Sequence, residues 1–125
     1  MPVISLILPL PISTNRLHVG SGKSKRRTED YSAWLTEAGW EINRQRPRLA
    51  VKALPARCWW RSRLRWPVGD AADSDNRIKA LHDLLVGMRL VPDDRWLHGG
   101  SYGRSALCPP GKCLVRVWSL SGVAP

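Results

Sequence analysis

Residues 57–66 alternate strictly between two kinds of side chain, which predicts a β-strand with one buried face. One set should face the core: Cys58, Trp60, Ser62, Leu64 and Trp66. The other set should face outward: Arg57, Trp59, Arg61, Arg63 and Arg65. Guanidinium groups with an indole between them are suited to phosphates and to stacking. A merely solvated arginine face has the same pattern, so this strand restricts the fold more than the function.

The first fifty residues predict a strand, a loop and a helix. Val3–Leu8 is an apolar run closed by a proline, as expected of a buried strand. Pro9–Arg27 is rich in Pro, Ser, Gly and basic residues and has no helical period, so we expect a loop. A helix should begin with Thr28 as its N-cap and end near Arg46, because proline disfavours helical geometry in the residue before it.

The second half of the chain predicts another helix and further strands. In a helix over residues 76–88, Asp75, Lys79 and Asp83 form one stripe beside the apolar face. The segment Arg95–Pro125 has the alternation and the Gly and Pro clusters of a hairpin. The fold class that we expect is α/β in an α+β two-layer form. It would be a single domain with a small mixed β-sheet of about four strands packed with two helices.

Charge is distributed unevenly along this chain. Its 20 Lys and Arg against 10 Asp and Glu give a net charge of +10, which favours nucleic acid as a partner. Six of the ten acidic residues nevertheless lie between Asp70 and Asp94. Clustered carboxylates repel one another and a polyanion alike, and a hard divalent cation is the simplest group to compensate them. Alternatively, Asp73 and Asp75 are helix caps, Asp75–Lys79 is an ordinary i,i+4 ion pair, and the later aspartates form a turn.

Two motifs resemble one known family. The segment DSDNRIKALHDLL, followed by VPDD, resembles the RusA family of Holliday-junction resolvases, whose signature is D-x-D-N-x-x-K-x-x-x-D followed by a D-D pair. The segment LPLPISTNR is similar to the family's L-P-x-P-x-S-x-N-R opening. The resemblance implies that Asp73, Asp75 and Asp94 bind Mg²⁺, with Mn²⁺ as a possible substitute, and that they are catalytic together with Lys79.

The resemblance also implies an activity and a partner. The family's activity is a crossover junction endodeoxyribonuclease, which resolves four-way DNA junctions by paired symmetric nicks in recombination and repair. A homodimer suits this substrate, because one active site must meet each opposed strand. Such proteins are frequently encoded by phages or prophages. We expect DNA contacts from Arg16, Lys23, Lys25, Arg26, Arg27, Arg61, Arg63, Arg65 and Asn76.

Two departures from the family pattern concern how this chain holds DNA. The residues before Asp73 are GDAA rather than basic, and Arg77 replaces the usual apolar residue after Asn76. Two other functions remain open: a metal nuclease acting on forks or flaps, and a non-catalytic basic DNA-binding module with a decayed site. A panel of synthetic forks, flaps and four-way junctions distinguishes the first from a junction resolvase. The second predicts that Asp75→Asn changes neither activity nor affinity.

Other classes of protein are less well supported by the sequence. Three cysteines are too few for a disulfide-stapled secreted fold, and Cys108 and Cys113 lack the spacing of a zinc pair. The amino-terminal apolar run lacks the basic leader and cleavage site of a signal peptide, and no segment is long enough to span a membrane. We therefore expect a cytoplasmic protein with no membrane contact and no small-molecule cofactor.

Overall fold

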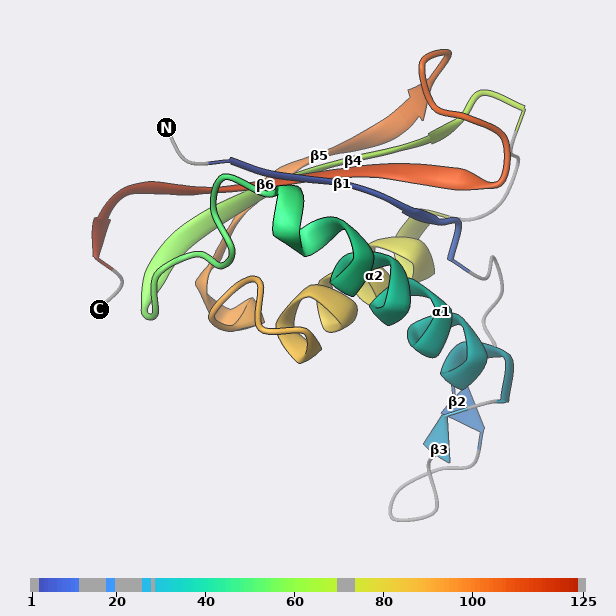
Figure 1. Cartoon of the computed structure of the whole chain (residues 1–125), viewed down its shortest axis with the longest axis horizontal. Coiled ribbons are helices and arrows are strands. Elements are labelled where there is room, and N and C mark those ends of the chain that lie inside the picture. The colour runs from blue at the N-terminus through green and yellow to red at the C-terminus, as the bar shows by residue number, and fades with distance from the viewer. Residues whose placement is uncertain (1–2, 12–17, 20–25, 28, 70–73, 124–125) are drawn as a thin grey trace.

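The structure is a computed structural model that describes residues 3–11, 18–19, 26–27, 29–69 and 74–123, with the side chains of 3–11, 29–69 and 77–120. Four strands form the main sheet: β1 (Val3–Pro9), β4 (Cys58–Pro67), β5 (Leu97–Ser105) and β6 (Lys112–Val123). Their order is β1-β6-β4-β5, with β4 and β5 parallel and the other pairs antiparallel. Two helices, α1 (Glu29–Gln45) and α2 (Ser74–Gly87), cover one face (Figure 1). The predicted two-layer fold with a mixed four-stranded sheet is confirmed.

Strand β4 lies inside the sheet and shows the predicted alternation. The indoles of Trp60 and Trp66 are fully buried on the helix side, with Leu64 between them. Arg61 and Arg63 are exposed on the other face. Because successive side chains of a strand point to opposite faces, one decapeptide supplies both the centre of the core and a charged surface.

Helix α1 ends where the sequence predicts, although Thr28, its predicted N-cap, lies outside the described residues. Its buried stripe packs on β1, and the indole of Trp34 donates a hydrogen bond to the carbonyl of Pro9 at 3.0 Å. The helix gives way at Gln45 to a 3₁₀ turn over Arg46–Arg48, which contains the predicted proline. The side chain of Gln45 bonds both the N–H and the C=O of Ile7, and so satisfies part of the free edge of β1.

Helix α2 begins two residues and ends one residue earlier than predicted. Leu81, Leu84 and Leu85 form its buried stripe, as the periodicity indicates. The residue that the periodicity does not explain is Arg77, which is only 2% exposed and lies over the ring of Trp66, 6.0 Å from the ring centroid. Burial lowers the pKa of Arg77, because the core disfavours the charged guanidinium.

Two sequence predictions about connectivity were wrong. The segment predicted as a loop contains a short antiparallel pair, β2 (His18–Val19) with β3 (Arg26–Arg27). The predicted C-terminal hairpin does not form, because β4 lies between β5 and β6. The Gly99-Gly100 pair is not a turn but part of β5, where a side chain at Gly100 would collide with the carbonyl oxygen of Ser62 on β4.

No helix within the described residues is long and apolar enough to cross a bilayer.

Candidate functional site

A short 3₁₀ turn, η3 (Asp94–Trp96), precedes β5 and carries one of the predicted metal ligands. Asp93 caps this turn, because its carboxylate accepts a hydrogen bond from the backbone N–H of Arg95 at 3.1 Å. Asp93 also forms an ion pair with Arg95, with 3.3 Å between Nε and Oδ2. The indole N–H of Trp60 donates to the carbonyl of Asp93 at 2.8 Å. The buried start of β4 therefore fixes the position of Asp94.

Helix α2 presents Asp83 toward the same region. The hydroxyl of Tyr31, from the first turn of α1, donates a hydrogen bond to Oδ2 of Asp83 at 3.3 Å. The charge of Asp83 contributes to the raised pKa of Asp94, and α2 contacts both η3 and α1. Tyr31 and Asp83 are 52 residues apart along the chain. A buried tyrosine needs a hydrogen-bond partner, which is the one signal that could have indicated this contact.

The two neighbouring aspartates, Asp93 and Asp94, have pKa values displaced in opposite directions. The pKa of Asp94 is raised, first by a hydrogen bond that its protonated form donates to Asp93, then by slight burial, and then by the charges of Asp93 and Asp83. The pKa of Asp93 is lowered, first by the hydrogen bond from the backbone of Arg95. The charges of Asp93 and Asp83 therefore account for part of the raised pKa of Asp94, and a bound cation would offset those charges.

The carboxylate oxygens near Asp94 are of the type that Mg²⁺ prefers, but too few of them are described close together to form a metal site. Among the side chains that the structure describes, no three His, Cys, Asp or Glu are arranged to hold a metal. Asp75 lies in the first turn of α2, two turns before Asp83, or about 12 Å of helix rise. One ion cannot be bound by both, since Mg²⁺ ligands lie about 2.1 Å from the metal. A metal site that includes Asp94 therefore needs Asp73 or Asp75, or water and phosphate oxygens.

The predicted site residues are described to different extents. Lys79 is exposed on α2, one turn before Asp83, and has no hydrogen-bond or ion-pair partner among the described residues. The backbones of Asp75 and Asn76 belong to α2, but their side chains lie outside the description, as does all of Asp73. The alternative of an Asp75–Lys79 ion pair is therefore not tested.

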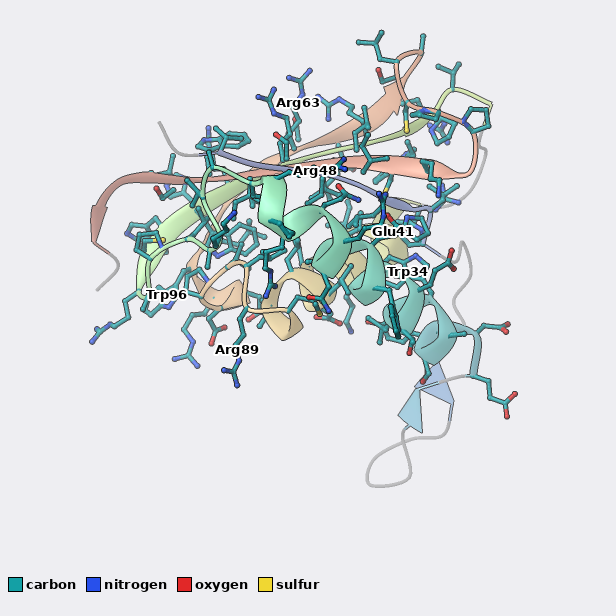
Figure 2. The ribbon with its side chains drawn as sticks, in the orientation of Figure 1. Trp34, Glu41, Arg48, Arg63, Arg89 and Trp96 are labelled. Carbon is teal, nitrogen blue, oxygen red and sulfur yellow. The ribbon has the colours of Figure 1, made fainter. Side chains whose placement is uncertain are left out.

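The predicted DNA-binding residues do not lie together with Asp94. By the alternation of β4, Arg61, Arg63 and Arg65 lie on the side of the sheet opposite to the buried core residues of that strand. The two helices lie on the core side (Figure 1). Figure 2 shows Arg63 beyond the sheet, whereas Arg89 and Trp96 lie on the helix side. The backbones of Arg26 and Arg27 form β3, and Arg16, Lys23 and Lys25 lie outside the described residues.

The uncovered side of the sheet also has a basic residue that the sequence predictions omitted. Arg116 on β6 is exposed and is the cross-strand partner of Arg63. Its signal was present in the sequence, because the alternation over Cys113–Trp118 places Arg116 opposite the core positions.

Comparison with known proteins adds no further assignment. Neither the scan against protein-family models nor the search of curated proteins finds a match to this chain.

Proposed function

We propose that this chain is a Mg²⁺-dependent endodeoxyribonuclease that resolves four-way DNA junctions, as its resemblance to the RusA family implies. The observation that carries the proposal is the meeting of η3 with α2, the helix that begins within the D-x-D-N-x-x-K-x-x-x-D signature. The later aspartate pair, Asp93 and Asp94, begins ten residues after Asp83, the last residue of the signature. A fold that brings Asp94 to this helix supports a shared role for the two motifs.

In this proposal Asp73, Asp75 and Asp94 hold the metal. When bound, Mg²⁺ lowers the pKa of a coordinated water and offsets the negative charge of the scissile phosphate. Lys79, which is exposed on α2, positions that phosphate and stabilises the charge that develops on it. Asp93 acts through its capping bond, which fixes the backbone that presents Asp94. Tyr31 holds Asp83 by a hydrogen bond, and the charge of Asp83 acts on Asp94.

A homodimer is part of the proposal, because a four-way junction needs two cuts related by two-fold symmetry. The same chemistry would also cut forks or flaps, and only substrate comparison separates these activities. A non-catalytic DNA-binding module is the second candidate. It is favoured by one observation, the row of arginines on the side of the sheet away from Asp94.

The test is a cleavage assay on a synthetic four-way junction with Mg²⁺, with forks and flaps as parallel substrates. We expect Asp75→Asn and Asp94→Asn each to lower the cleavage rate by at least about 100-fold, because residues that bind the metal matter at least as much as the residues that support them. Glu37→Gln, an exposed acid elsewhere on α1, is the matched control and should cleave at the wild-type rate. Wild-type protein that binds the junction but never cuts it would favour the binding module.

A further inference from the structure

The uncovered side of the sheet is rich in basic and apolar side chains. Both helices lie on the other side (Figure 1). None of the four strands contains Asp or Glu. We call this surface the exposed sheet face and define it by these residues: Val3, Ser5, Ile7, Arg61, Arg63, Arg65, Ser101, Leu114, Arg116 and Trp118. Its positive charge is therefore not balanced within the sheet.

The arginines of the exposed sheet face lie close to one another. Arg63 and Arg116 are cross-strand partners, and Arg65 donates a hydrogen bond to the hydroxyl of Ser101 at 3.1 Å. The pKa of Arg65 is lowered, first by burial and then by the charge of Arg63. Arg61, Arg63 and Arg116 form no ion pair with any acid that the structure describes. Like charges held together without an acidic partner favour an anionic ligand.

The spacing of these arginines fits a linear polyanion. Arg61, Arg63 and Arg65 alternate along β4, so consecutive members lie about 6.7 Å apart along the strand. This distance is comparable to that between successive phosphates of an extended nucleic-acid strand. Guanidinium groups bind phosphate through two parallel hydrogen bonds, which makes arginine better suited to this role than lysine.

Two shallow pockets adjoin the Arg63–Arg116 pair. One, of about 210 Å³, is lined by Val3, Trp118 and both arginines. The other, of about 180 Å³, is lined by Leu107, Leu114, Arg65, Ser105 and both arginines. Each therefore combines guanidinium groups with apolar surface. A duplex turns its phosphates outward and keeps its bases paired inside, so it would leave this apolar surface unfilled. An unpaired strand supplies a phosphate and a base together.

We propose that the exposed sheet face binds single-stranded nucleic acid. Phosphates lie on the row of arginines, and bases enter the two pockets, one of them stacking against Trp118. The inference goes beyond the proposed nuclease and does not depend on it, because the surface lies across the sheet from Asp94 and needs no catalysis. A second copy of the chain is a poorer occupant, since a two-fold contact would place the arginine row against itself.

The test measures the anisotropy of a labelled thymidine oligonucleotide of about 20 nucleotides, with full-length protein in EDTA so that no cleavage occurs. We expect Arg63→Gln/Arg116→Gln to weaken binding by roughly tenfold and to reduce the slope of log K against log salt by about 1.4, or 0.7 per lost phosphate contact. Arg57→Gln/Arg89→Gln removes the same charge from exposed turn residues that are not part of this face and form no ion pair with a described acid, and should change neither.

A second variant tests the pockets without a change in charge. Trp118→Leu should weaken binding of the oligonucleotide by about fivefold or more, because a base stacked on an aromatic ring is lost, and should leave the salt slope unchanged. Near-UV circular dichroism of each variant confirms that the fold is retained, and a loss of affinity counts only in a folded variant.

Three outcomes would overturn the proposal. The first is equal loss of affinity in the two charge-matched double variants, which would mean a general charge effect. The second is a duplex, or poly-glutamate of equal charge, that binds as tightly as the oligonucleotide and responds equally to Arg63→Gln/Arg116→Gln. The third is conversion of a wild-type dimer to a monomer by that variant, which would make the face a subunit contact. Preference for the single strand, lost in the Arg63 and Trp118 variants, supports it.

Discussion

The two sides of the central sheet carry clusters of opposite charge, carboxylates around Asp94 and arginines on the exposed sheet face. On the helix side, a hydrogen bond to Asp93, slight burial and the charges of Asp93 and Asp83 raise the pKa of Asp94, so its carboxyl is harder to ionise. On the exposed sheet face, burial and a neighbouring guanidinium lower the pKa of Arg65, so its charge is harder to keep. Each displacement reduces the local charge, and each would be reversed by a ligand of opposite sign. The net charge of +10 conceals this separation.

One buried layer keeps the two sides apart. Ser62 of β4 and His82 of α2 meet in it, with 2.9 Å between the hydroxyl oxygen and Nε2. Trp60 packs edge-on against the same imidazole, with 5.4 Å between ring centroids. The comparison teaches that a cluster of carboxylates and a cluster of guanidinium groups can share a domain of this size when a single packed layer separates them.

The largest expected effect separates catalysis from binding. Lys79→Gln should lower the single-turnover rate of junction cleavage at saturating protein by about 100-fold, since a charge that stabilises the transition state is lost. Arg63→Gln/Arg116→Gln should leave that saturated rate unchanged, because those residues lie across the sheet. Single-turnover cleavage at saturating protein measures both. A fall of similar size in both variants would mean that the two sides act on the same phosphate.

The next prediction concerns the buried layer. Burial lowers the pKa of His82, and the charge of Asp83 only partly opposes this. The folded state therefore binds its proton less readily than the unfolded state, whose pKa is near 6.5. The free energy of unfolding should be constant above pH 6.5 and fall below it, with a slope of at most about 1.4 kcal/mol per pH unit.

Urea unfolding between pH 5 and pH 8 measures this slope. His82→Gln should remove most of the pH dependence in that range, whatever its effect on absolute stability. His98→Gln, at an exposed position, is the control and should keep the wild-type slope. A slope that survives in His82→Gln would assign the proton uptake to another group.

A smaller effect tests the role of Asp83. Tyr31→Phe removes a partly buried hydrogen bond and should lower the free energy of unfolding by about 1 kcal/mol. Asp83→Asn should cost about as much and should retain junction cleavage within about threefold, because Asp83 lies about 12 Å of helix rise from Asp75. A loss of cleavage as severe as in Asp94→Asn would indicate that Asp83, in the middle of α2, binds the metal.

The smallest effect is electrostatic. Without metal, Asp94→Asn should raise the free energy of unfolding at pH 7 by about 0.5 kcal/mol, because an exposed repulsive charge is removed. The pKa of Asp94 is raised in the folded state, so the gain should be absent below pH 3.8, where Asp94 is protonated in both states. Unfolding by guanidinium chloride at pH 7 and at a pH below 3.8 tests the sign of this change in the free energy of unfolding. A destabilised variant at pH 7 would contradict repulsion at this residue.

Local patterns in the sequence predicted the elements but not their neighbours. The alternation of β4 and the periodicity of α2 follow from side-chain geometry within one segment, and both predictions were confirmed. The insertion of β4 between β5 and β6 is a non-local pairing, which turn signals cannot reveal. The burial of Arg77 likewise depends on Trp66, a residue of another element.

For the candidate site too, local sequence patterns predicted the residues but not their contacts. The D-x-D signature and the later aspartate pair were identifiable as residues with a shared chemistry, and the structure brings Asp94 to α2. The contacts of Asp83 with Tyr31 and of Asp93 with Trp60 join segments far apart in the chain, so no local pattern predicts them. Arg116 was visible in the alternation of its strand, but its place beside Arg63 requires the register of β4 with β6.

The most direct test of the separation of charge is thermal unfolding with and without Mg²⁺. A ligand at 100 times its Kd stabilises the folded state by about 2.7 kcal/mol, which is a shift of several degrees for a domain of this size. The account predicts this shift for the wild type and for Arg63→Gln/Arg116→Gln, and its absence in Asp94→Asn. An equal shift in Asp94→Asn, or none in the wild type, would contradict it.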